Sequence, residues 1–243
     1  MTGYRARLGF LIPPGNPTTE PEVIRLTPPG VSVHFTRMVA HGVTGSLAGQ
    51  EERNRTQIAH LDENVALLSM VNPSVMVLAH TASSYTLGKT GEAELVERMQ
   101  RSSGFRFITA FGSVVEALRR LGVERVAVGT PYSETSTQQC KAHLGAYGFK
   151  VVNIGRLAGV QNIYDETAER AYGLARQVDT ADAQAVFLSG VGMPTIETLA
   201  MMEQDLGKPV ISSTAAMMWN ALRIADVNAP VTGFGRLLAS PGL

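Results

Sequence analysis

The sequence predicts an α/β fold of two pseudo-symmetric lobes, each a mainly parallel sheet with helices on both faces. Three observations lead to this prediction. Short apolar runs recur along the chain, amphipathic stretches lie between them, and segments of the first half align with segments of the second. Alternation of strand and helix is typical of parallel sheets whose right-handed crossovers carry helices on both faces. The length of 243 residues leaves room for two such lobes.

The strands are expected where short apolar runs are bounded by turn-forming residues. Runs this short and this apolar are typical of strands buried on both faces of a parallel sheet. In chain order we expect strands over Leu8–Ile12, Val31–Phe35, Val75–Ala79, Phe105–Thr109, Val126–Gly129, Val151–Ile154, Ala185–Ser189 and Val210–Ser213.

Helical spacing occurs between these runs. Ser113–Leu121 and Ala215–Ile224 place apolar residues three or four positions apart, which predicts an amphipathic helix. A helix is also expected over Ile163–Arg176. The longest stretch with this spacing is Glu51–Met70, whose apolar positions are Ile58, Leu61, Val65 and Leu68.

Three pairs of segments suggest a duplicated lobe. They are Leu8–Asn16 with Val126–Glu134, Val75–His80 with Ala185–Gly190, and Phe107–Arg119 with Ile211–Arg223. The alternative that stays open is that all strand–helix units look alike. On the duplication hypothesis, residues 1–118 and 214–243 form the first lobe, residues 119–213 form the second, and the site lies in the cleft between them.

Composition excludes several classes of protein. Hydrophobic residues make up 44% and charged residues 17%, which is too apolar for a disordered chain. Lys plus Arg equals Asp plus Glu, at 21 each, so we expect no nucleic-acid partner. The one cysteine, Cys140, excludes a disulfide scaffold. Without a signal-peptide pattern or an apolar run of about 18 residues, we expect no membrane contact and a cytoplasmic location. On general grounds a homo-oligomer is expected.

Ligands of open parallel sheets bind beyond the carboxyl ends of the strands. Four loops lie there: Pro13–Thr18, His80–Tyr85, Thr130–Ser133 and Ser189–Pro194. They are rich in neutral hydrogen-bond donors, contain no Asp or Glu, and carry His80 as their only side chain that can become a cation. Such donors at helix N-termini favour an anion, and we expect a small carboxylate.

Familiar cofactor motifs are absent from the sequence. No glycine-rich dinucleotide fingerprint, phosphate loop, metal-binding His pair or nucleophile elbow occurs. The sequence therefore argues against NAD, ATP and zinc, and we expect neither a cofactor nor a metal.

Several segments, taken in order, carry a family resemblance: Pro13–Asn16, Phe107–Val128, Gly129–Tyr132, Ser189–Leu199, Leu206–Arg223 and Gly233–Leu237. They resemble the aspartate/glutamate racemase superfamily, and within it the branch of arylmalonate decarboxylase and maleate cis-trans isomerase. The resemblance spans nearly the whole chain. It implies two flavodoxin-like lobes with a cofactor-free active site in the cleft between them.

The resemblance also implies a cysteine at the end of a central strand in each lobe. Here those positions hold His80 and Gly190, and Cys140 lies in a predicted helix, where we expect it to be a packing residue. Because Gly190 has no side chain, one face of the substrate lacks a proton carrier, which argues against two-base racemisation. His80, with an ordinary pKa near 6.5, is the candidate proton carrier.

By the same resemblance, the residues that hold substrate carboxylates are Asn16, Tyr132 and Asn162, and we also place Tyr132 with His80 as catalytic. Each residue also has a structural interpretation. Asn16 precedes Pro17 and could simply shape a turn. Tyr132 could be an aromatic side chain that lines the cleft, and Asn162 could cap the helix that we expect after it.

Further donors are expected beside them. Thr81 stands where the decarboxylase has an oxyanion-pocket threonine, and it also suits a helix N-cap. The serine that usually follows is Ala82 here, so Ser83 and Ser84 are the candidates for the missing hydroxyl. Gly190 and Val191 are placed with the substrate-binding residues, Val191 through a backbone N–H at a helix start.

These features lead to three hypotheses of function. The first is a cofactor-independent lyase that decarboxylates a small carboxylate or dicarboxylate, or eliminates a group from it, through an enediolate or carbanion. The second is an isomerase in which His80 and water replace the cysteines. The third is a protein that binds a carboxylate without turnover.

Overall fold

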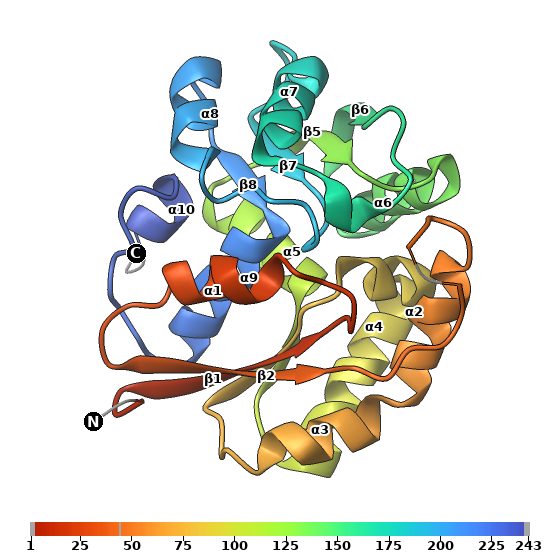
Figure 1. Cartoon of the computed structure of the whole chain (residues 1–243). Helices are drawn as coiled ribbons and strands as arrows, with labels where there is room; N and C mark the ends of the chain where they lie inside the picture. Colours follow the sequence, from red (N-terminus) through yellow and green to blue (C-terminus); the bar gives the residue numbers. More distant parts are fainter. Residues whose placement is uncertain (1–2, 44, 241–243) are drawn as a thin grey trace.

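The computed structural model describes residues 3–43 and 45–240 and contains two four-stranded parallel sheets (Figure 1). The first sheet has the order β2-β1-β3-β4 and the second has the order β6-β5-β7-β8, so the two orders match with an offset of four strands. The predicted fold class is therefore confirmed. The strands are β1 (Ala6–Ile12), β2 (Val31–Arg37), β3 (Val75–Leu78), β4 (Phe107–Thr109), β5 (Arg125–Thr130), β6 (Lys150–Arg156), β7 (Ala185–Leu188) and β8 (Val210–Ser212).

All eight predicted strands form, each within two residues of its expected bounds. The central strands β3 and β7 are buried along their whole length because each lies between two neighbours and under helices on both faces. Their continuous apolar sequences are the pattern expected of such strands.

Helices cover both faces of each sheet, and three of them lie between the sheets in Figure 1: α1 (Thr19–Arg25), α5 (Ala110–Arg120) and α9 (Ser213–Ile224). The remaining helices pack on the other faces or at the junction of the lobes. They are α2 (Gln50–Ala59), α3 (Leu61–Ser69), α4 (Thr81–Ser103), α6 (Glu134–Ala146), α7 (Ala168–Val178), α8 (Leu199–Leu206) and α10 (Arg236–Ala239).

The helices α5 and α9 begin in the same way, as expected of duplicated units. Each is capped by the last residue of the preceding strand: Thr109 Oγ1 accepts from the Gly112 N–H at 2.8 Å, and Ser212 Oγ accepts from the Ala215 N–H at 3.2 Å. A single hydrophobic core continues from one sheet to the other through these two helices.

The lobe boundaries stay a prediction. Breaks at 118/119 and 213/214 would fall inside α5 and α9, both of which pack between the sheets. Residues 1–2, 44 and 241–243 of the proposed first lobe lie outside the described residues.

The expected long helix over Glu51–Met70 is two helices in the structure. The chain turns at His60, and only α3 buries the apolar stripe of Leu61, Val65 and Leu68. Ile58, placed on the same stripe from the sequence, stays partly exposed on α2, which buries Asn54 and Gln57 instead. The polar face of α2 therefore points inward.

The helix expected over Ile163–Arg176 also starts later than predicted. Ile163–Asp165 form one 3-10 turn, and α7 begins at Ala168 after the cap Thr167, whose Oγ1 accepts from the Arg170 N–H at 3.3 Å. A threonine in this position is a strong helix start, and the chain uses it in preference to Asn162.

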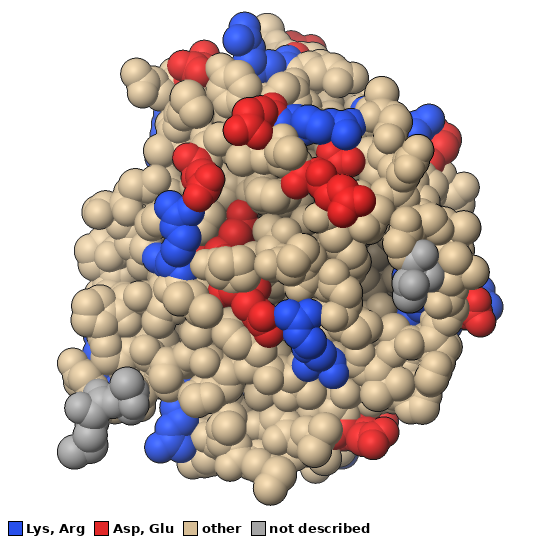
Figure 2. Space-filling view, viewed as in Figure 1, with Lys and Arg blue, Asp and Glu red and all other residues tan. Residues whose placement is uncertain are grey.

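Charged side chains of both signs are interspersed on the face shown in Figure 2. Within residues 3–43 and 45–240, every helix is too short or too polar to cross a membrane. Over the same residues, no group of three or more His, Cys, Asp and Glu side chains has the arrangement of metal ligands.

Candidate active site

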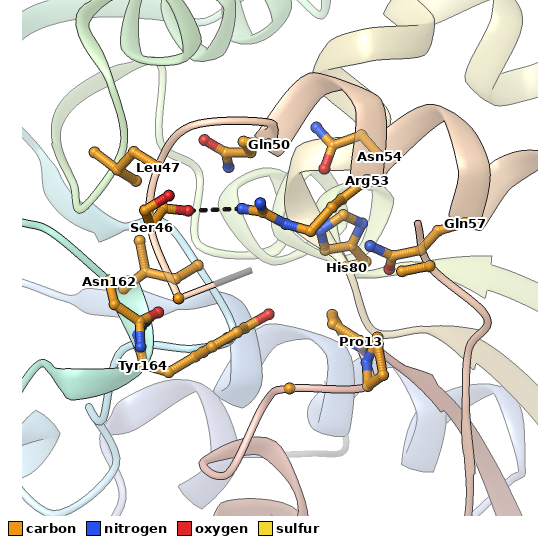
Figure 3. A pocket seen from close by; sticks show the side chains of 15 residues that line it. Pro13, Ser46, Leu47, Gln50, Arg53, Asn54, Gln57, His80, Asn162 and Tyr164 are labelled. Carbon is orange, nitrogen blue, oxygen red and sulfur yellow. Dashed lines mark hydrogen bonds between the residues drawn. The ribbon is translucent and has the colours of Figure 1, made fainter. Parts of the chain in front are cut away.

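A cavity of about 200 Å³ opens at the carboxyl ends of the first-lobe strands. One wall is the loop after β1, including Pro13 and Gly15, and another is α2 with the loop before it. His80 and the segment from Asn162 to Tyr164 complete the lining (Figure 3). Because about 300–1,000 Å³ is usual for drug-sized ligands, this space suits a small molecule.

His80 connects β3 to α4 and lines the cavity as predicted. Its side chain is 8% exposed, and its Nδ1 lies 2.7 Å from the Ser83 Oγ. Burial, together with the positive charge of Arg53, lowers the pKa of His80 to about 4. The imidazole is therefore neutral at pH 7.

Gly190 occupies the position after β7 that corresponds to His80 after β3, since each follows its strand by two residues. Its φ of +107° is a left-handed conformation, and a Cβ there would lie 3.1 Å from the Tyr132 hydroxyl. The site therefore has a side chain at one of the two equivalent positions and a glycine at the other.

Tyr132 lies beside Gly190, is 3% exposed and is not among the residues that line the cavity. Burial raises the pKa of its phenol well above the usual value, and the neighbouring Tyr164 and Cys140 raise it further. Tyr132 is therefore a hydrogen-bond donor and not an anion at any ordinary pH.

The hydroxyls at the start of α4 point in different directions. Ser83 contacts His80, whereas Ser84 donates to the Glu92 carboxylate at 2.7 Å and faces away from the cavity. Thr81 is fully buried, and its Oγ1 has no hydrogen-bond partner among the described residues. The expected N-cap role of Thr81 is wrong by one residue, since His80 holds the N-cap position and Thr81 is the first residue of α4.

Both polar atoms of the Asn16 side-chain amide already form hydrogen bonds within the protein. Its Oδ1 accepts from the backbone N–H groups of Thr18 and Thr19 at 2.8 and 3.1 Å. Its Nδ2 donates to Thr19 Oγ1 at 2.8 Å and to the Val191 carbonyl at 3.3 Å. Asn16 therefore shapes its turn and joins the two lobes, which is the alternative that the sequence left open.

The expectation for Val191 is wrong in one respect, because no helix starts there. Residues 191–193 form a turn, and α8 begins only at Leu199. The backbone N–H of Gly190 donates to Ser213 Oγ at 3.1 Å. The loop after β7 thus lacks the helix N-terminus that would help to hold an anion.

Asn162 lines the cavity and caps the short turn that follows it, with its Oδ1 accepting from the Tyr164 N–H at 3.3 Å. Tyr164, which the sequence did not single out, reaches into the cavity from the same side (Figure 3). Burial raises the pKa of Tyr164 to about 12, so its hydroxyl is a neutral donor.

The sequence prediction also missed the wall formed by α2. Arg53, Asn54 and Gln57 line the cavity together with Gln50. The expected site of neutral groups plus His80 therefore also contains a guanidinium. The signal was the polar spacing of the segment QEERNRTQ, whose positions 50, 53, 54 and 57 share one helix face.

Cys140 does not line the cavity. It lies on α6 and is fully buried, and burial raises the pKa of its thiol to about 12. Such a thiol is neither a nucleophile nor a proton carrier at neutral pH.

Comparisons with known proteins place this arrangement in a family. The family model described as arylmalonate decarboxylase matches residues 8–238. The chain belongs to the arylmalonate decarboxylase family. Members of this family and of the related maleate isomerases are similar to it over most of their length, and the resemblance inferred from the sequence is confirmed.

Two curated relatives illustrate the similarity. The maleate isomerase of Nocardia farcinica is 30% identical, with 96% of this chain and 95% of the relative covered. The arylmalonate decarboxylase of Bordetella bronchiseptica is also 30% identical, with 68% of this chain and 70% of the relative covered.

Solved structures agree with this placement. The maleate isomerase of Pseudomonas putida S16 superposes with a TM-score of 0.88 at 25% identity, covering 98% of this chain and 99% of the other. A Nocardia farcinica maleate cis-trans isomerase with a covalently bound succinylcysteine intermediate gives a TM-score of 0.86 at 26% identity, covering 96% and 98%. The two parallel sheets of this chain thus have the arrangement of the family.

Proposed function

We propose that this family member is a cofactor-independent lyase that acts on a small carboxylate through an enediolate intermediate. The observation that carries the proposal is the asymmetry of the site. One strand end supplies a buried, neutral imidazole, and the equivalent end supplies Gly190. A single proton carrier suits chemistry on one face of the substrate carbon.

His80 has two available roles. In elimination, the neutral imidazole takes the α-proton, the C–H electron pair forms an enediolate, and that pair then expels the leaving group on the β-carbon. In decarboxylation, the C–C bond to the departing carboxylate breaks, carbon dioxide leaves, and the imidazolium protonates the enediolate carbon. Since the imidazole of His80 is neutral in the free protein, it has the protonation state that elimination requires.

The enediolate needs hydrogen-bond donors. Asn162 and Tyr164 line the cavity, whereas Thr81, next to His80 in the chain, and Tyr132, beside Gly190, are buried outside its lining. We assign the carboxylate contacts to Asn162 and Tyr164, which line the cavity, with Ser83 holding the imidazole of His80.

A second candidate is an isomerase in which His80 and water take the place of cysteines. The relatives named maleate isomerase favour it, since one is 30% identical over 96% of this chain. A covalent cysteine adduct like the succinylcysteine of the Nocardia farcinica structure has no counterpart here, because the sole cysteine is buried on α6. An isomerase of this chain would therefore need to use proton transfer.

The decisive test is proton exchange at the α-carbon in heavy water, followed by NMR over a panel of malonates, maleates and hydroxy acids. The wild type should exchange the α-proton of at least one acid, and His80→Ala should lose about 100-fold or more of that rate. His34→Ala, a histidine change on β2, is the matched control and should exchange normally.

The products separate the hypotheses. Carbon dioxide or an eliminated fragment supports the lyase, and an isomeric acid of unchanged formula supports the isomerase. Binding of an acid with no exchange and no product across the panel would show that the protein is a carboxylate binder. The cytoplasmic location and the homo-oligomeric state stay predictions.

A further inference from the structure

One face of α2 forms a polar wall of the cavity. Gln50, Arg53, Asn54 and Gln57 are three or four positions apart, so they share one side of the helix, and all four line the cavity. Asn54 is 4% exposed and Gln57 is 3% exposed. Helices normally bury apolar residues at such positions, so a buried polar face indicates a surface that binds something polar.

Arg53 is the single Lys, Arg, Asp or Glu side chain in the cavity lining, counted over the described residues. Its guanidinium donates to backbone carbonyls of the preceding loop, at 2.8 Å to Ala48, at 2.9 Å to Ser46, and also to Val43. Within the described chain it has no carboxylate partner. A guanidinium held only by neutral carbonyls forms stronger bonds when a carboxylate replaces one of them.

The charge of Arg53 acts across the whole cavity. On one side it adds to the effect of burial in lowering the pKa of His80, and on the other it opposes the burial that raises the pKa of Tyr164. Figure 3 shows these two side chains and Arg53 around the same space. A negative group placed there would lie in the field of one uncompensated cation.

Gln57 supplies an independent sign of a missing ligand. It is almost completely buried, and its Oε1 has no hydrogen-bond partner among the described residues, as is also true of Gln50 Oε1. Because an amide can be turned by 180°, Gln57 can present either end to a ligand. Buried side-chain amides are normally hydrogen-bonded, so this one is built to meet a polar group.

We propose that Arg53, assisted by Gln57, is the specificity-determining residue of the site and binds a second carboxylate of the substrate, remote from the reacting carbon. The proposal rests on the proposed function for the reacting end of the substrate. It assigns to this chain a dianionic acid with an anionic side arm, because an aryl arm against α2 would leave the charge of Arg53 without a counter-charge and the Gln57 amide oxygen without a hydrogen-bond partner.

The test measures binding without chemistry. Succinate and its monoamide, succinamate, differ by one charge, and 3-phenylpropanoate offers an aryl arm of similar reach. Isothermal titration calorimetry of the wild type should show at least about 30-fold tighter binding of succinate than of either monoanion. Arg53→Gln should reduce that preference to about threefold or less by weakening succinate alone.

Arg55→Gln is the matched control, since Arg55 is on the same helix but exposed and paired with Glu51, and it should keep the full preference. Arg53→Lys keeps the charge and should keep a reduced preference. Circular dichroism and thermal unfolding show whether the loop contacts of Arg53 are needed for folding.

An unchanged preference in a folded Arg53→Gln protein would overturn the assignment, as would equal binding of succinate and succinamate by the wild type. Both results leave the role of His80 intact, because proton exchange is measured separately. Loss of exchange chemistry with the charge preference preserved would instead overturn the proposed function alone.

Discussion

The buried imidazole of His80 makes stability depend on pH in a way that can be measured. Its pKa is about 4 in the folded protein and near 6.5 in an unfolded chain. Between these values the unfolded state binds more protons, so the free energy of unfolding falls as pH drops through that window. From pH 7.5 to pH 5.0 the loss due to this one group is about 2 kcal/mol.

The measurement is urea unfolding of the wild type and of His80→Asn at both pH values. Asn can still donate to Ser83 but does not titrate, so the variant should lose about 2 kcal/mol less than the wild type over this range. The other histidines are present in both proteins, and their contributions cancel. If both proteins lose stability in parallel, His80 is not a desolvated neutral imidazole and the argument for a base fails.

Three further changes test the frame around the site. Glu92→Leu removes the acceptor of four buried or half-buried hydrogen-bond donors. Urea unfolding should show that it lowers the free energy of unfolding by about 3–5 kcal/mol. The control Glu94→Gln, at an exposed position, should change the free energy of unfolding by no more than about 0.5 kcal/mol. Gly190→Ala should destabilise the protein by about 1–3 kcal/mol because the φ of Gly190 is +107°. Gly173 is exposed on α7 with open space around it, so Gly173→Ala should stabilise the protein by about 0.5–1 kcal/mol in the same assay. Cys140→Ala should keep full turnover, and the native thiol should resist alkylation until the protein unfolds; loss of turnover would point to cysteine chemistry.

The architecture was predictable because its signals are local and repeated. Eight short apolar runs became eight strands, and the alignment of Val75–His80 with Ala185–Gly190 identified two equivalent strand ends from the sequence alone. Parallel sheets bury their strands on both faces, so apolar runs alone carry the information. His80 and Asn162 were placed in the cavity for the same reason, since each follows from its position in the duplicated lobe or its family motif.

The polar wall was missed because the direction in which a helix faces is a tertiary property. In Glu51–Met70 the apolar spacing was followed through Ile58, but the chain breaks at His60 and α2 rotates its polar side toward the cavity. The sequence contained the spacing of Arg53 and Gln57, but a charged helix face is usually solvated, and nothing local marks one that is buried.

For Asn16 the sequence offered two interpretations, ligand binding and turn shaping, and in the structure its side chain bonds to its own turn. An asparagine before a turn has backbone N–H groups within reach two and three residues on, so these bonds form without bringing distant parts of the chain together. Its remaining donor then bonds to Val191 of the other lobe. Family motifs name such residues correctly but do not tell which of their polar atoms stay free.

The two proposals support each other through charge. Burial, with a smaller contribution from the cation of Arg53, keeps His80 neutral in the free protein, which is the form that accepts a proton. On the proposed binding mode, a carboxylate bound to Arg53 offsets that cation and removes its part of the lowering of the His80 pKa. The imidazolium that then forms lies next to the anion that it has helped to create, and its charge no longer opposes that of the guanidinium. Selection of a dianion and proton transfer on one face of the substrate therefore both depend on the charge of Arg53. A single imidazole can then carry the proton, although the family resemblance implies a proton carrier at both strand ends.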